Sequence, residues 1–416
     1  MQDSTELPPE LMARIFSACL PPTQDAFPHA DTAPMLLCRV CRRWRSIALS
    51  TPELWATFVA KDGKASVETL KLWSDRSGSL PLTYVLDSNV IDTGKILLET
   101  ATAYKQRWGT LILHLCDQSF APLNSISSCR LPLLRSLELK ARWRREGHGM
   151  TAPDPRRLPT FDLGGAPNLT ELRLTSYPRN HLTGIPWHRL TVLKLEGRVV
   201  RRDMERLALC RALVDLTLSY PGSGPIIQPA LNMVPELVHL PQLQSLTTDA
   251  SEILTCLRLP RLRHLDLEVF GNEDPLNLLS ALRDWACTLR SLTVTRPSPG
   301  VPLSNILPGI PTLQLLSLDF RYSDSLNSPH IGDLRPLISI FKDPHILMHL
   351  RRITVTCCST KWETPDVLRR SYSLPVRQRI GGLECRSHWV TRTYHSSPFE
   401  HRNQRLWSGR SGVVST

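Results

Sequence analysis

The chain has 416 residues, of which 41% are hydrophobic and 21% charged, a composition typical of globular proteins rather than disordered or fibrous ones. A small module with one large body, or a long repeat array, is the natural division of this length. The formal net charge of +12 would suit a nucleic-acid partner, but nine Arg and two Glu between Arg369 and Thr416 carry +7 of it. A mildly basic body with a basic tail is not a nucleic-acid-binding footprint, so we expect no such partner.

Cysteine usage and hydropathy bear on the compartment. The eleven cysteines are irregularly spaced, and the N-terminus lacks the basic region and long apolar core of a signal peptide. No window approaches the roughly eighteen consecutive apolar residues needed to span a bilayer. We therefore expect reduced thiols, no membrane partner and a cytoplasmic or nuclear location.

The chain opens with a predicted amphipathic helix. Pro is tolerated in a first helical turn, and Glu10 complements the positive end of the helix. Leu11, Ile15 and Phe16 recur at a spacing of three to four residues and form one apolar face. The pair Pro21-Pro22 ends the helix.

A second helical segment follows a polar connection. Residues 23–34 show no apolar period and are predicted to form a loop, whereas residues 35–48 resume the helical pattern and include Trp44. Leu54 and Trp55 then return as apolar residues on a short turn. Three short helices that share an apolar face cannot bury all of it among themselves, so we expect a partner surface.

Four separated elements carry a resemblance to a known family: Leu7-Pro8-x-Glu10-Leu11, Ile15-Phe16, Val40-Cys41-Arg42-Arg43-Trp44 and Pro52-Glu53-Leu54-Trp55. In this order and spacing they resemble the F-box, the motif by which substrate receptors of cullin-RING ubiquitin ligases dock onto the Skp adaptor. The longer connection at residues 23–34 and the segment at residues 76–82 resemble F-box proteins of mushroom-forming fungi. The resemblance implies a Skp-family adaptor and, through it, a cullin as partners. It assigns the adaptor-binding surface to Leu7, Pro8, Leu11, Ile15, Phe16, Val40, Trp44, Leu54 and Trp55.

Helices and strands are then predicted to alternate. Residues 66–73 and 95–108 have the pattern of helices, and residues 82–86 and 111–115 alternate apolar with other residues as strands do. This order favours an α/β body.

The most informative internal pattern is the template Leu-x-x-Leu-x-Leu, whose copies lie 19 to 37 residues apart. The register points one apolar residue inward at the strand entry and two more along the strand. Strands of one polarity with return segments between them stack in parallel as a solenoid, similar to the leucine-rich repeats behind many F-boxes, although the regular Asn or Cys is missing. The copies begin at Leu134, Leu169, Leu190, Leu213, Leu243, Leu262, Leu289, Leu313 and Leu350.

These patterns predict an α/β chain of three parts. Residues 1–60 form a three-helix F-box, residues 61–358 an irregular leucine-rich-repeat-like solenoid with a parallel sheet, and residues 359–416 a basic tail of low order.

Several motifs that could carry chemistry are incomplete. Cys38-x-x-Cys41 has the spacing of a metal or redox half-site, but both cysteines fall on an amphipathic helix and no second pair lies nearby. Cys357-Cys358 and Cys385-x-x-His388 are equally incomplete, and Gly222-Ser223-Gly224 is predicted to be a turn rather than a phosphate-binding loop. We therefore expect no metal, no cofactor and no catalytic residue.

Two arginine pairs, Arg42-Arg43 and Arg351-Arg352, suit either a solvated face or contacts with an acidic partner. The favoured hypothesis is a non-catalytic substrate receptor whose repeat body binds a target protein. An F-box scaffold that assembles no ligase, and an enzyme with an unrecognised site in the α/β body, are the alternatives.

Overall fold

The computed structural model describes residues 7–61, 65–126, 129–142, 144–146, 149–197, 201–219, 237–249, 251–267, 274–295, 306–319, 349–359, 379–380 and 383–391. The chain divides into two compact units, Met1–Arg290 and Ser291–Thr416. In the part of the chain that the structure describes, no helix combines the length and hydropathy needed to cross a membrane.

The first unit begins with short helices: α1 (Pro9–Ala18), η1 (Thr23–Asp25), α2 (Leu37–Val40), α3 (Arg42–Leu49) and η2 (Pro52–Trp55). The expected continuous helix over residues 35–48 is therefore wrong in one respect, because it is broken at Cys41. Cys41 is fully extended, with φ −158° and ψ 170°. Its Sγ accepts the backbone N–H of Trp44 at 3.4 Å, so Cys41 serves as the N-cap of α3.

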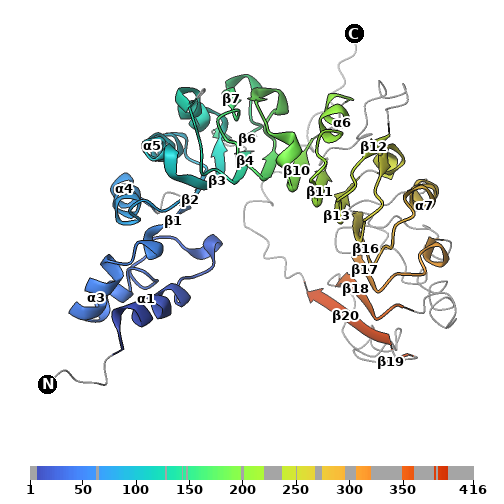
Figure 1. Cartoon of the computed structure of the whole chain (residues 1–416), viewed down its shortest axis with the longest axis horizontal. Helices are drawn as coiled ribbons and strands as arrows, with labels where there is room; N and C mark the ends of the chain where they lie inside the picture. The colour runs from blue at the N-terminus through green and yellow to red at the C-terminus, as the bar shows by residue number, and fades with distance from the viewer. Residues whose placement is uncertain are drawn as a thin grey trace, which may run out of the picture. The chain divides into compact units, whose positions relative to one another are not determined.

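A parallel sheet forms the body of the first unit (Figure 1). Its strands follow the order β1, β2, β3, β4, β8, β10, β11, β13, β15, and each pairs in parallel with its neighbour. The strands are β1 (Thr57–Lys61), β2 (Leu82–Ser88), β3 (Trp108–Cys116), β4 (Ser136–Arg142), β8 (Glu171–Thr175), β10 (Val192–Glu196), β11 (Asp215–Ser219), β13 (Ser245–Thr248) and β15 (His264–Leu267).

The return segments are helical or irregular. Figure 1 shows α4 and α5 on the same face of the sheet. The helices are α4 (Val67–Arg76), α5 (Ile91–Thr102), α6 (Arg201–Leu207) and α7 (Asp274–Trp285), and 3-10 segments include η3 (Lys105–Arg107), η4 (Asp117–Ile126) and η7 (Trp187–Arg189). Short strands pair within this layer: β5 (Arg144–Glu146) with β6 (Gly149–Thr151), β7 (Phe161–Asp162) with β9 (Leu182–Thr183), and β12 (Val238–His239) with β14 (Leu257–Arg258).

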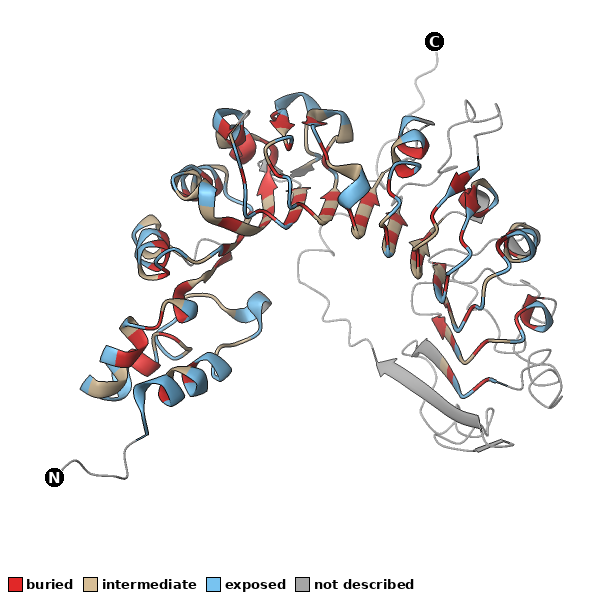
Figure 2. Ribbon diagram, in the orientation of Figure 1, coloured by how far each residue is buried: buried red, intermediate tan, exposed pale blue. Residues whose placement is uncertain are grey.

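The leucine template supplies the core, as its register predicted. Template residues from Leu134 to Ile353 are all buried, while the residues between them are partly exposed, which gives the striped strands of Figure 2. Neighbouring copies are in register, so Leu172 pairs with Leu193 and Leu193 with Leu216. Apolar side chains are therefore stacked in rows along one face of the sheet.

Most of the template strands are preceded by the same tight turn, which sequence reasoning missed. The N–H of Leu134 donates to the carbonyl of Leu131, and the N–H of Leu213 donates to that of Cys210. In most copies, although not before Leu190 and Leu289, the residue three positions before the first leucine is also buried. One carbonyl per entry also accepts two N–H groups from the next entry, as Thr170 does from Thr191 and Val192. These bonds satisfy backbone groups at the strand entries without the regular Asn or Cys that the sequence lacks.

The sheet starts earlier than predicted. Residues 57–61 form β1, which pairs with β2 from Thr57 to Lys61, although the sequence pattern placed the first strand at residue 82. Strand β1 is short and has the buried centre Phe58-Val59-Ala60 instead of a clear alternation, and such runs are ambiguous without their pairing partner.

The second unit contains the strands β16 (Ser291–Thr295), β17 (Leu315–Asp319) and β18 (Arg352–Ser359), which pair in parallel in this order. The 3-10 segment η10 (Leu307–Gly309) lies between β16 and β17 in the sequence. Within the tail that was expected to lack order, the structure has β20 (Leu383–Thr391) parallel to β18, and β19 (Arg379–Ile380) antiparallel to β20. Leu383, Cys385 and Trp389 alternate with polar residues, a period that the sequence reading overlooked. The remainder of the tail and Gly222-Ser223-Gly224 lie outside the described residues.

Candidate functional site

The segment of helix α1 has two sets of apolar side chains, one buried and one exposed. It starts after Pro8, whose carbonyl accepts the N–H groups of Leu11 and Met12, both at 3.1 Å. Met12 and Phe16 face inward, and Phe16 is completely buried. Leu7, Leu11 and Ile15 recur every four residues, so they share the adjacent side. Their exposed fractions are 47%, 45% and 45%, and we call these three residues the apolar ridge.

The end of helix α2 adds a further exposed apolar side chain. Val40 is 54% exposed, directly before the break at Cys41. Leu36, which sequence reasoning did not assign to the site, is 44% exposed on the same short segment. Helix α2 ends at Val40 and α3 starts at Arg42. The extended residue Cys41 therefore separates Leu36 and Val40 from the arginines of α3.

Trp44 lies between the surface and the core. It is half-buried on α3, and its ring centroid lies 5.0 Å from that of Phe16 on α1. Arg43 fastens the same two elements, because its Nη2 donates to the carbonyl oxygen of Leu7 at 2.6 Å. Arg43 of α3 therefore holds Leu7, the first residue of the apolar ridge, in place.

Phe16, Leu54 and Trp55 are core residues. The Trp55 Nε1–H donates to the carbonyl of Ala48 at 2.9 Å, and its ring packs edge-on against Trp73 of α4, with centroids 4.8 Å apart. The guanidinium of Arg76 also lies over the Trp55 ring, with its Cζ 4.5 Å from the ring centroid. These three predicted adaptor-binding residues therefore support the surface from within.

The charge around the apolar ridge is positive on α3. Arg42 and Arg45 are exposed and lie three residues apart, so they share a helix side, whereas Arg43 is engaged by Leu7. Cys38 is buried, and burial raises the pKa of its thiol against the opposing effect of Arg76 and Arg45. Among the described residues no group of three His, Cys, Asp or Glu could hold a metal ion.

This geometry defines a class: a small helical docking domain, with apolar side chains left on its surface, in front of a parallel-stranded α/β body. In the comparison with known families, residues 5–61 match the family described as F-box-like. An F-box domain implies a Skp-binding adaptor role in SCF-type ligases, and F-box proteins are generally non-catalytic adaptors. No curated protein matches the chain.

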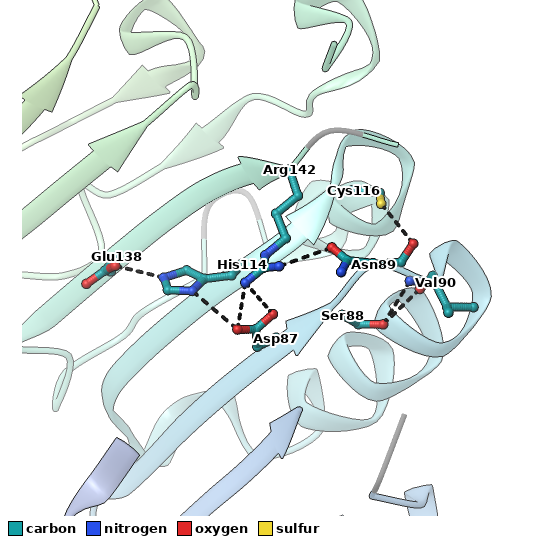
Figure 3. Close-up of polar contacts among 8 residues, drawn as sticks. All are labelled: Asp87, Ser88, Asn89, Val90, His114, Cys116, Glu138 and Arg142. Carbon is teal, nitrogen blue, oxygen red and sulfur yellow. Dashed lines mark hydrogen bonds and ion pairs between the residues drawn. The ribbon is translucent and has the colours of Figure 1, made fainter. Parts of the chain in front are cut away.

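A second polar site lies on the open face of β2, β3 and β4 (Figure 3). His114 of β3 points between two carboxylates: its Nε2 lies 2.7 Å from Oε1 of Glu138, and its Nδ1 lies 3.8 Å from Oδ2 of Asp87. Arg142 donates from Nη2 to Asp87 at 2.7 Å and from Nη1 to Asn89 at 3.1 Å. We call Asp87, His114, Glu138 and Arg142 the polar cluster.

The pKa values in the polar cluster move in the directions that favour charge. Burial lowers the pKa of His114, but the neighbouring carboxylates of Asp87 and Glu138 together raise it by more. Burial raises the pKa of Asp87, and His114 and Arg142 outweigh it, so the net shift is downward. The hydrogen bond from His114 also lowers the pKa of Glu138, against burial. The polar cluster thus joins two carboxylates to the guanidinium of Arg142 and to an imidazole whose charged form the carboxylates favour.

Sequence reasoning did not assemble the polar cluster. The signal that could have found it is alternation: buried Leu113 and Leu115 place His114 on the opposite face of β3. The pairing of Asp87 with His114 across β2 and β3 then brings the charges together. Of the arginine pair at residues 351–352, both side chains are exposed. The side chains of Cys357, Cys358, Cys385 and His388 lie outside the described residues.

Proposed function

We propose that this protein is the substrate-recognition subunit of an SCF-type cullin-RING ubiquitin ligase, acting in the cytoplasm or nucleus. The observation that carries the proposal is the apolar ridge, exposed on a segment that matches the F-box-like family. Catalysis would be performed by partner proteins, and this chain would contribute proximity by holding a target near the ubiquitin-loaded enzyme.

The burial pattern supports a division of the predicted adaptor-binding residues. Leu7, Pro8, Leu11, Ile15 and Val40 are exposed and would contact the Skp-family adaptor, with Trp44 at the edge of the contact. Phe16, Leu54 and Trp55 would keep the contacting helices in place. Covering the exposed part of each aliphatic side chain would stabilise the complex by roughly 1 kcal/mol. The exposed Arg42 and Arg45 favour an adaptor with an acidic rim.

The proposal for the body is a leucine-rich-repeat-like solenoid whose open strand face binds the target protein. The in-register leucines and the repeated entry turn support it. Charged residues of the open face include Glu138, Glu171, Arg173, Lys194 and Asp266. Their signs are mixed, and Arg173 Nη1 already donates to Glu171 Oε2 at 2.9 Å, so the face favours a target of mixed charge.

Adaptor capture tests the docking surface. In the full chain, replacing both Leu11 and Ile15 by Ala should weaken capture of a Skp-family adaptor by about 30-fold, since roughly 2 kcal/mol of burial is lost. A matched control is the double replacement of Val90 and Ile96 by Ala, because these side chains are 55% and 49% exposed outside the F-box-like segment. Equal capture by the ridge variant and the wild type would place the interface elsewhere.

Cullin in the captured complex separates a ligase from a scaffold. A receptor brings cullin with the adaptor, and its target accumulates when the proteasome is inhibited. A scaffold captures adaptor alone. Point variants suit this experiment better than deletion of residues 1–60, because the deletion would remove most of β1 from the sheet.

A further inference from the structure

A hollow opens at the carboxyl ends of two neighbouring strands of the first unit. It encloses about 340 Å³ and is lined by residues that follow β8, by the end of β10 and by α6. The backbone leaves both strands in unusual conformations there, with φ 53° at Ser176 and φ 120° at Gly197. The carboxyl ends of parallel strands are where open α/β sheets bind ligands, and non-glycine residues with positive φ concentrate at functional positions.

A buried ion pair forms one wall of the hollow. Arg179 Nη1 donates to Asp203 Oδ2, and Arg179 Nη2 donates to the carbonyl of Gly197 at 3.0 Å. Asp203 is buried on α6, with its side chain 3% exposed. Arg206 Nη1 lies 3.7 Å from the other oxygen of the same carboxylate. One buried carboxylate thus lies against two guanidinium groups.

The hollow contains more positive than negative charge. Arg202, exposed on the same helix, forms no ion pair with any residue that the structure describes, and Glu196 contributes the second carboxylate of the lining. Three arginines therefore meet two carboxylates. Burial lowers the pKa of Arg206, Asp203 opposes this, and the nearby charges of Arg202 and Arg179 add to the lowering. A further negative group would relieve this repulsion.

The orientation of Arg206 suits anion recognition. Its guanidinium lies over the ring of Trp187 at 5.5 Å from the centroid, which restricts the side chain. A guanidinium presents paired donors whose spacing matches two oxygens of a phosphoryl or carboxylate group. The volume lies at the small end of the range for ligand sites, so it fits a small molecule rather than a length of chain.

We propose that this hollow is a binding site for a small free anion with a phosphoryl or carboxylate group, held by Arg202 and Arg206. The ion pair of Arg179 and Asp203 forms the fixed wall behind it. The site lies in the α/β body and does not depend on adaptor docking.

Calorimetric titration of the full chain with inorganic phosphate, and separately with acetate, tests the site. Phosphate should bind and raise the melting temperature, while Arg202→Gln should weaken binding by about tenfold, the loss expected for one charge-assisted hydrogen bond. Arg206→Gln should weaken it by a similar factor. Arg202→Gln keeps the test interpretable, since its exposed side chain has no described ion-pair partner whose loss would affect folding.

The matched control is Arg211→Gln, which removes the same charge from an exposed position outside the lining. Its binding should equal that of the wild type, and equal weakening by Arg211→Gln and Arg202→Gln would reduce the effect to net charge and overturn the proposal. Absence of binding by the wild type to both anions would also overturn it. So would binding of a phosphoserine peptide that free phosphate does not displace, because the occupant would then be a protein segment.

Discussion

The F-box-like segment and the parallel-stranded body differ in how far their apolar side chains are buried. In the body, the template leucines are at most a few per cent exposed, since each is covered by the neighbouring unit. Leu7, just before α1, and Leu11 and Ile15 on α1 remain almost half exposed, although the same helix buries Met12 and Phe16. Apolar residues that a fold does not cover are available to another protein. The stability of the fold and the proposed docking role therefore fall on different apolar residues, and substitutions can separate them.

The largest effect on stability should come from the body. Leu193 is buried between its register partners Leu172 and Leu216. Leu193→Ala should lower the free energy of unfolding by about 2–5 kcal/mol, from lost burial and the cavity that remains. Urea denaturation followed by circular dichroism measures this. Leu209→Ala is the control, because Leu209 is 55% exposed; similar losses for both variants would mean that the template leucines are not the core.

An intermediate, pH-dependent effect is expected from the polar cluster. The raised pKa of His114 means that its charge stabilises the fold fully below its ordinary pKa of 6.5, and that this contribution is lost as pH rises through the folded-state value. Asp87 and Glu138 have lowered pKa values, so their contribution is present above their ordinary values of 3.8 and 4.5 and is lost as pH falls. The network is therefore strongest between pH 4.5 and 6.5.

His114→Gln should lower the free energy of unfolding by about 1 kcal/mol at about pH 6, and by less at about pH 9. Urea titrations at both values measure the difference. The charge of Lys61 also lowers the pKa of Asp87, and those of Arg173 and Lys194 lower the pKa of Glu138, so they act in the same direction as His114. Lys140→Gln, at the position paired with His114, is the control. A loss for His114→Gln that grows with pH would contradict the assignment.

The smallest effect on the free energy of unfolding is expected from the apolar ridge. Leu11→Ala and Ile15→Ala, each alone, should change the free energy of unfolding by no more than about 0.5 kcal/mol, as exposed substitutions usually do. Measured beside the double variant used for adaptor capture, unchanged stability ties lost capture to the surface. If either variant is destabilised as strongly as Leu193→Ala, the ridge belongs to a core that the burial pattern does not reveal.

Local patterns predicted what depends on local spacing. The leucine register placed buried residues correctly from Leu134 to Ile353, because side-chain period is a property of the strand itself. The break at Cys41 was missed because the helical period runs through it, and only its extended backbone reveals the cap. The polar cluster could not be assembled from sequence because it depends on the pairing of β2, β3 and β4, which is non-local.

In the proposed receptor, the aromatic packing at Trp55 would set the distance between the adaptor and the target. Trp55 contacts Trp73 of the first body helix, and Phe58 of β1 lies 6.3 Å from Trp73 and 6.4 Å from Tyr84 between ring centroids. The docking domain thus joins the sheet through packed rings rather than through a flexible linker of variable span. The adaptor and the sheet would then keep a fixed position relative to each other. The lysines modified on a bound target would therefore be those that lie at one fixed distance from the adaptor.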